Sequence, residues 1–150
     1  MPLNISRLTR FARQFGRFYA RQFTPLLART GLSMREVHVL LFLANNPGLD
    51  TARDITELRG LSKSQVSQAV ETLADRDILR RAPDQSDRRV VHLSITEAGL
   101  PLAQEMQAIQ AAFGRRLLEA LPESEQTEFL RLLEKMLGDT EKMMEGESQL

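Results

Sequence analysis

The fold is decided by residues 49–79, which read LDTARDITELRGLSKSQVSQAVETLADRDIL. Asp50 or Thr51 can cap a helix of about two turns that ends near Leu58, because their side-chain oxygens accept hydrogen bonds from the free N–H groups of a helix start. Gly60 then interrupts the helix, since glycine favours the conformations that close one. The stretch therefore begins with a short helix and a turn.

A second helix follows the glycine. Ser62 and Gln65 have the spacing of a capping box, which marks a helix start. One side of this helix is apolar at helical spacing, with Val66, Ala69, Val70 and Leu73. The other side is polar and comprises Ser62, Lys63, Ser64, Gln65, Ser67 and Gln68. Two helices joined by a turn with glycine are typical of a helix-turn-helix, with the recognition helix over about residues 62–76.

The period of the apolar residues changes after the second helix. Residues 78–82 read as a strand, residues 83–86 as a polar turn and residues 90–95 as a second strand. The sequence therefore predicts a two-stranded hairpin, a wing over about residues 78–95. A hairpin that directly follows a helix-turn-helix indicates a winged helix, and we expect residues 33–95 to form that lobe.

The hairpin turn is highly charged, since residues 84–99 read DQSDRRVVHLSITEAG. An arginine at the tip of a wing can enter the minor groove of DNA, where the negative potential is deepest over A·T-rich sequence. We interpret Arg89 as this side chain, Asp87 as the carboxylate that orients its guanidinium, and Arg88 as a phosphate contact. With the polar face of the second helix in the major groove, these residues predict an interface for double-stranded DNA.

Two other interpretations stay open. In the first, the charged residues lie on a solvated hairpin and only prevent association at the strand edges. In the second, the winged helix is a protein-interaction module without specific DNA binding. Such a module would more often display aromatic or aliphatic anchors on the second helix, so the polar face of that helix favours DNA.

Helical segments flank the lobe. Residues 5–27 predict one amphipathic helix, which carries five of the chain's eight aromatic residues: Phe11, Phe15, Phe18, Tyr19 and Phe23. A core helix is predicted from Ser33 to Leu43, a long helix from Thr96 to about Leu121, and a last helix after Pro122. The fold class is therefore mainly α with a small β-hairpin. The first segment carries more apolar surface than one helix leaves in water, so it must pack against something large.

Composition limits the function classes. The 150 residues suit a single domain, and the formal net charge of zero hides a value of +6 for residues 1–91 and −6 for residues 92–150. A basic front half favours a polyanionic partner, although two solvated faces of a neutral protein would give the same count. No apolar run is long enough to span a membrane, so we expect a soluble chain. The absence of cysteine fits a reducing cytoplasm.

The sequence gives no reason to expect an enzyme, a cofactor or a metal. His38 and His92 are the only histidines, and neither has carboxylates or thiols at metal-ligand spacing. We expect His38 to pack within a helix and His92 to face solvent from a strand. No phosphate loop, nucleophile elbow or paired carboxylates occur.

The N-terminal segment has an alternative interpretation. Residues 1–35 contain seven arginines and no acidic residue, which is also typical of a mitochondrial transit peptide. The segment supplies aromatic residues that the fold needs, however, and runs directly into the domain. We therefore expect it to belong to the fold.

Three stretches together resemble the multiple antibiotic resistance regulator (MarR) family of bacterial winged-helix repressors. They are GLSMREVHVLLFLA at residues 31–44, GLSKSQVSQAVETLADRDILRR at residues 60–81, and DQSDRRVVHLSITEAG at residues 84–99. The resemblance covers about residues 5–144. Its most specific part is the pair Asp87 and Arg89, followed by the strand and LSITEAG.

The resemblance implies a homodimeric regulator of transcription that binds pseudo-palindromic operators, often released by small aromatic or phenolic ligands. Its dimerisation region would comprise residues 5–30 and 97–145, which accounts for the surplus apolar surface. Two residues depart from the family pattern: many relatives have a basic residue in place of Gln68 and a glycine in place of Asp77. Either Gln65 or Gln68 could then pair with adenine.

The resemblance also implies an effector cavity between the dimerisation helices and the DNA-binding lobe. The residues that could line it, with Arg17 or Arg21 as an anion partner, are Phe15, Phe18, Tyr19, Phe42 and Met106. Ordinary packing in the core is the competing interpretation for most of them.

Overall fold

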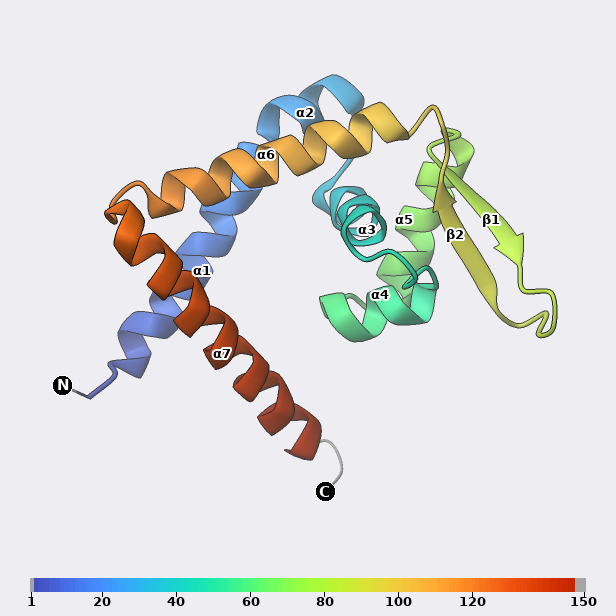
Figure 1. The fold of residues 1–150 in the computed structure, drawn as a ribbon. Helices are drawn as coiled ribbons and strands as arrows, with labels where there is room; N and C mark the ends of the chain where they lie inside the picture. The colour runs from blue at the N-terminus through green and yellow to red at the C-terminus, as the bar shows by residue number, and fades with distance from the viewer. Residues whose placement is uncertain (1, 148–150) are drawn as a thin grey trace. The chain divides into compact units, whose positions relative to one another are not determined.

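The computed structural model describes residues 2–147, in which seven helices and two strands follow one another (Figure 1). The elements are α1 (Ile5–Gln22), α2 (Thr24–Thr30), α3 (Met34–Asn45), α4 (Ala52–Arg59), α5 (Lys63–Asp75), β1 (Leu79–Pro83), β2 (Val91–Ile95), α6 (Leu100–Leu118) and α7 (Glu123–Glu147). The mainly helical fold with one hairpin is as predicted. No helix in the described part of the chain is long and apolar enough to cross a membrane.

By its internal contacts the chain divides into two units, residues 1–111 and 112–150. The first unit contains the core, in which α3, α4, α5 and the hairpin pack together. Helix α3 is the most deeply buried, and Val37, Val39 and Leu40 have no exposed surface. From the other elements the core takes Phe23, Leu26, Ile55, Val66, Ala69, Leu73, Leu79, Leu93 and Met106.

The helix-turn-helix forms as its local sequence predicts. Thr51 caps α4: its hydroxyl accepts a hydrogen bond from the Asp54 N–H at 3.2 Å, and its own N–H donates to Asp54 Oδ2 at 3.0 Å. Gly60 ends α4 with a φ of 67°, in the left-handed region that glycine enters at little cost. The second helix then begins after Ser62.

The N-terminal segment is two helices rather than the one predicted over residues 5–27. Helix α1 ends at Gln22 and α2 begins at Thr24. Pro25 explains the break, because in a continuous helix its ring would clash with the carbonyl of the preceding turn. Proline is tolerated in the first turn of α2, where no N–H partner is lost. Phe23 lies at the break and is fully buried in the core.

The wing is a hairpin as predicted, but both strands begin one residue later than the sequence predicted. The antiparallel pairs run from Leu79 opposite Ile95 to Pro83 opposite Val91, so Pro83 belongs to β1 and not to the turn. The N–H of Asp84 then donates to the carbonyl of Val90 at 2.9 Å, which closes the turn. Proline fits the end of a strand because it cannot donate a hydrogen bond to the ladder.

Helix α6 begins at Leu100, four residues later than the predicted start at Thr96. The Thr96 hydroxyl donates to the carbonyl oxygens of Asp77 and Ile78, which ties the chain to the base of the hairpin before the helix can form. Gly99 completes this junction, since a Cβ atom there would lie 2.4 Å from the Ile78 carbonyl oxygen. The junction thus requires a residue without a side chain.

In the second unit, the end of α6 turns into α7 near Pro122. The Gln126 side chain donates to the carbonyl oxygens of Leu118 and Leu121, at 3.1 and 2.9 Å, and so satisfies the end of α6. A last helix after Pro122 is as predicted. No side chain of α7 is buried, although Phe129, Leu132 and Met136 are large and apolar.

Helix α5 ends in a Schellman motif centred on Asp77. The N–H of Ile78 donates to the carbonyl of Leu73 at 2.9 Å, and the N–H of Asp77 donates to that of Ala74 at 3.0 Å. Asp77 has a φ of 57° and is the only residue other than glycine with a positive φ among those described. A side chain is strained in this conformation, although aspartate tolerates it better than most residues.

We expect Asp77→Ala to lower the free energy of unfolding by about 1 kcal/mol, whereas Asp77→Gly should equal or exceed the wild type, because only glycine adopts this φ without strain. Urea denaturation at a fixed protein concentration measures both. Glu71→Ala is the control, since Glu71 is exposed within α5 and should change stability by less than about 0.5 kcal/mol. Equal losses for the Ala and Gly variants would contradict this account.

Candidate nucleic-acid interface

The start of α5 is fixed by a reciprocal pair of hydrogen bonds. The N–H of Gln65 donates to Ser62 Oγ at 3.1 Å, and the N–H of Ser62 donates to Gln65 Oε1 at 3.0 Å. This is the capping box that the spacing predicts. It holds the first turn of α5 and engages the carbonyl oxygen of the Gln65 side chain.

The two faces of α5 differ sharply in exposure. Val66, Ala69, Val70 and Leu73 are buried in the core. On the other face Gln65 is half-buried, and the exposed side chains are Ser62, Lys63, Ser64, Ser67 and Gln68. Gln68 Oε1 accepts a hydrogen bond from the Arg35 guanidinium at 3.3 Å. Arg35 of α3 thus adds to Lys63 a second positive charge beside this face, which sequence reasoning did not predict.

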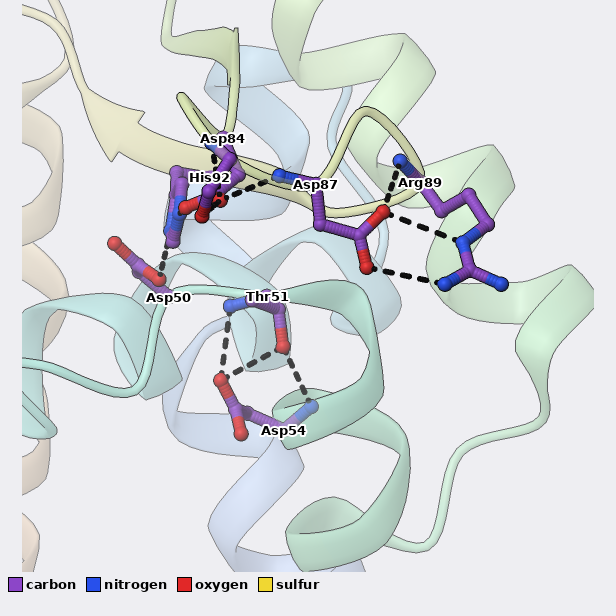
Figure 2. Close-up of polar contacts among 8 residues, drawn as sticks. Asp50, Thr51, Asp54, Asp84, Asp87, Arg89 and His92 are labelled. Atoms are coloured by element: carbon purple, nitrogen blue, oxygen red, sulfur yellow. Dashed lines mark hydrogen bonds and ion pairs between the residues drawn. The ribbon is translucent and has the colours of Figure 1, made fainter.

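The wing tip orients an arginine. Asp87 Oδ1 accepts hydrogen bonds from the backbone N–H of Arg89 at 3.0 Å and from its Nε at 3.2 Å, and Oδ2 accepts one from its terminal nitrogen at 3.4 Å (Figure 2). The Arg89 side chain is nevertheless 91% exposed. The guanidinium is therefore oriented by the carboxylate while it stays open to solvent. Arg88 beside it is also exposed.

A second aspartate holds the turn that carries Asp87. Asp84 Oδ2 accepts hydrogen bonds from the N–H groups of Ser86 and Asp87, both at 3.0 Å, and from the Ser86 hydroxyl at 2.8 Å. The other oxygen, Oδ1, lies 2.8 Å from Nε2 of His92. These contacts, the one from His92 above all, hold the pKa of Asp84 well below its usual range.

The His92 side chain lies in β2 and is 39% exposed, in line with the expectation that it faces solvent, but it also has two acidic partners that the sequence did not indicate. Its Nδ1 lies 2.8 Å from Asp50 Oδ1 and its Nε2 lies 2.8 Å from Asp84 Oδ1, so the ring bridges two carboxylates (Figure 2). The hydrogen bond to Asp50, followed by that to Asp84, raises the pKa of His92. Sequence reasoning did not identify these two partners, since Asp50 is 42 positions away from the histidine and Asp84, 8 positions away, falls in the predicted polar turn.

The other histidine lies where it was expected. His38 is half-buried in α3 and its Nδ1 contacts the Arg59 guanidinium. Burial, together with the charge of Arg59, lowers the pKa of His38. Within residues 2–147 no three potential ligands among His, Cys, Asp and Glu are grouped so that they could hold a metal ion.

The residues named for an effector cavity are placed differently from one another. Met106 and Phe42 are buried in the core, Tyr19 and Phe15 are half-buried, and Phe18 is exposed. The Tyr19 hydroxyl accepts a hydrogen bond from Gln110 Nε2 at 2.7 Å. Gln110 Oε1 in turn accepts one from Asn45 Nδ2 at 2.9 Å. The sequence did not indicate this polar link between α1, α6 and α3.

Comparisons with known proteins agree on one family. A family model described as the MarR family matches residues 30–90. An uncharacterised HTH-type transcriptional regulator of Bacillus subtilis, YwaE, is 30% identical over 88% of this chain and 77% of its own length. The HTH-type transcriptional repressor Rv2887 of Mycobacterium tuberculosis is 28% identical over 75% of this chain and 81% of its own length.

Solved structures share the fold. The complex of Staphylococcus aureus MepR with DNA has a TM-score of 0.71 at 22% identity and covers 92% of this chain and 99% of its own. Bordetella bronchiseptica BpsR, whose DNA binding is regulated by 6-hydroxynicotinic acid, has a TM-score of 0.68 at 22% identity and covers 87% of this chain and 98% of its own.

The hairpin after the helix-turn-helix, the exposed polar face of α5 and the match to YwaE point to the same conclusion. Proteins of this family regulate transcription and are not enzymes, as the sequence led us to expect. The chain belongs to the MarR family of transcriptional regulators, and its winged helix is a DNA-binding module.

Proposed function

We propose that the protein is a homodimeric repressor that binds a pseudo-palindromic operator and is released from it by a small ligand. In this proposal residues 33–95 contact DNA, and residues 5–30 and 97–145 form the dimer. One observation carries the proposal: the Arg89 guanidinium is oriented by Asp87 at the tip of an exposed wing. A repressor of transcription acts where the operator lies, so we place it in the cytoplasm.

Helix α5 would enter the major groove. The groove of B-DNA is about 12 Å wide and admits one helix, whose N-terminal side chains reach the base edges. The exposed hydroxyl, amide and ammonium side chains of α5 lie in its cap and first two turns, between Ser62 and Gln68, and the exposed carboxylates Glu71 and Asp75 lie further along the helix. Small hydroxyls and amides on this face allow close approach to the DNA, and Lys63 supplies charge for a phosphate.

The hydrogen bonds of Gln65 and Gln68 favour a structural role for the first and contact with a base for the second. Bidentate pairing with adenine needs both the oxygen and the nitrogen of a side-chain amide. Gln65 Oε1 already serves the capping box, and Gln65 is half-buried. Gln68 is exposed, and its contact with Arg35 is long at 3.3 Å. Gln68 is therefore the better candidate for reading a base.

The wing would place Arg89 in the adjacent minor groove. A guanidinium held in one plane by a carboxylate loses less rotational freedom on binding than a free side chain. Asp87 makes this arrangement before DNA arrives. Arg88 on the same tip is exposed and would contact a phosphate, which would add affinity without sequence preference.

A second copy would cover the exposed apolar side chains. No residue of α1 or α7 is buried in the single chain. Apolar side chains more than a third exposed include Leu8, Phe11 and Phe18 of α1 and Phe129, Leu132, Met136, Leu137 and Met143 of α7. Two-fold pairing would remove this surface from water and set two recognition helices about 34 Å apart, one turn of DNA.

The regulatory part of the proposal rests on the family and on the polar link. Rv2887 is named a repressor, and the DNA binding of BpsR responds to an aromatic acid. In this chain Gln110 donates a hydrogen bond to the Tyr19 hydroxyl and accepts one from Asn45, and these bonds join α1 and α6 to α3. A phenolic or carboxylate ligand beside Phe15, Phe18, Phe42 and Met106 would compete for these bonds.

The wing and the recognition helix should respond differently to mutation. Arg89→Ala should weaken operator binding by about 1–3 kcal/mol and relax the preference for A·T pairs at the wing site. Lys63→Ala should weaken binding on all sequences and reduce the salt slope by about one, because it removes one phosphate contact. The operator is first selected from random DNA, and fluorescence anisotropy on operator and scrambled duplexes across a salt series then measures both variants. Unchanged affinity for Arg89→Ala would overturn the proposed role of the wing.

The dimer can be tested through α7. Leu132→Glu puts a charge in each half of the proposed interface, and we expect the dissociation constant of the dimer to rise by about 100-fold or more, since burying one leucine is worth about 1.5–3 kcal/mol. Sedimentation velocity over a concentration series measures it. Leu58→Glu is the matched control, because Leu58 of α4 is also at least half exposed but lies outside the proposed interface. A wild type that sediments as a monomer at micromolar concentration refutes the dimer.

A further inference from the structure

His92 connects the wing to the helix-turn-helix through two carboxylates. Asp50 lies just before α4, His92 lies in β2, and Asp84 follows β1. Backbone contacts run beside the ring: the N–H of Leu93 donates to the Asp50 carbonyl at 2.8 Å, and Thr51 pairs with His92 as an isolated antiparallel bridge. The side chain is 39% exposed, so the cluster is open to solvent and its proton can exchange.

The distances from the two ring nitrogens of His92 to the carboxylates indicate that the ring is protonated. A neutral imidazole donates from one nitrogen only, and the other nitrogen is an acceptor. Both ring nitrogens of His92 lie 2.8 Å from a carboxylate oxygen, and an ionised carboxylate can only accept. Both contacts are therefore hydrogen bonds only when His92 is a cation. Loss of its proton would set a lone pair against one of the carboxylates.

The cluster is linked to the wing tip by successive contacts. His92 Nε2 contacts Asp84 Oδ1, and Asp84 Oδ2 accepts hydrogen bonds from the backbone N–H groups of Ser86 and Asp87. The Asp87 side chain then holds Arg89. Each contact fixes the next along the turn, so the position of Arg89 relative to α4 depends on the charge of the imidazole.

The surroundings of His92 contain few other charges. In the hairpin register the residue directly opposite is Ala82, and the same face of β1 also holds Arg80, opposite Ser94. On the α4 side the carboxylate of Asp54 is turned to the N–H and hydroxyl of Thr51. The groups that contact the ring are therefore Asp50 and Asp84, and they raise the pKa of His92.

We propose that Asp50, His92 and Asp84 form a positioning cluster that locks the wing to the helix-turn-helix while His92 is protonated, and that alkaline pH loosens Arg89 from its place at the DNA. This inference rests on the proposed contact of Arg89 with DNA. It adds that His92 sets the position of Arg89. His92 touches no DNA in this proposal and acts through Asp84 and the turn. Because the pKa of a histidine stabilised as a cation is raised, the lock is complete below about pH 6.5 and is lost as the pH rises through the folded-state pKa.

The first test is a titration of the wild-type protein followed by the ring protons in NMR. The chain has two histidines, so the spectrum holds two sets of imidazole signals, and His38→Gln assigns them. We expect His92 to titrate above about pH 6.5 and His38 below it, since burial lowers the pKa of His38. In Asp84→Asn the midpoint of His92 should fall. A midpoint for His92 at or below that of His38 would overturn the proposal.

The second test is operator binding from about pH 6 to about pH 9 by fluorescence anisotropy. We expect the affinity of the wild type to fall by up to about tenfold as the pH rises, with a midpoint at the pKa of His92. A tenfold fall corresponds to a difference of about one unit between the pKa of His92 in the DNA-bound and in the free protein. His92→Gln should bind at every pH as the wild type binds at alkaline pH, and the control His38→Gln should keep the wild-type profile. In the Arg89→Ala background the His92→Gln change should have little further effect, because the cluster acts through Arg89.

The outcomes separate this inference from the proposed function. If the wild type binds no operator at any pH, the proposed function fails, whatever the titration gives. If the wild type binds and His92→Gln has the same pH profile as the wild type, the positioning role fails and the proposed function stands. An equal effect of His92→Gln with and without Arg89 would likewise exclude action through the wing tip.

Discussion

One face of α5 is buried against its neighbours in the core, and this burial decides which side chains the helix presents to solvent. Val66, Ala69 and Leu73 have no exposed surface, so α5 cannot rotate about its axis without exposing them. The opposite face is polar and fixed in direction. The Schellman motif at Asp77 then directs the chain from α5 into β1, which places the wing next to the same core.

The charges at the wing form an ordered system and not merely a solvated tip. Successive hydrogen bonds join Asp50, His92, Asp84 and Asp87 to Arg89, and only the last of these is almost fully exposed. A two-stranded hairpin is marginally stable on its own. The polar contacts at one end and the Thr96 junction at the other support this one at both ends. That support is what a wing needs if it is to hold an arginine at a set position.

The remaining helices have the opposite character. Helices α1 and α7 bury none of their residues in the single chain, and each carries a row of exposed apolar side chains. Exposed apolar surface of this extent marks a site of contact with another molecule. Membership of the MarR family and the exposed faces thus support the same proposal, in which DNA binding and self-association are coupled through one chain.

The sequence by itself determined the features that depend on near neighbours. The capping residues Thr51 and Ser62, the turn at Gly60 and the pairing of Asp87 with Arg89 each involve residues within a few positions, so spacing alone predicts them. The break at Pro25 is equally local, but the apolar period of residues 5–27 continues across it and by itself predicts one helix. Only the tertiary structure decided that His92 meets Asp50, that Arg35 meets Gln68 and that Tyr19 meets Gln110. These pairs are 33 to 91 positions apart, and contacts at such separations follow from how the helices pack, which no local pattern records.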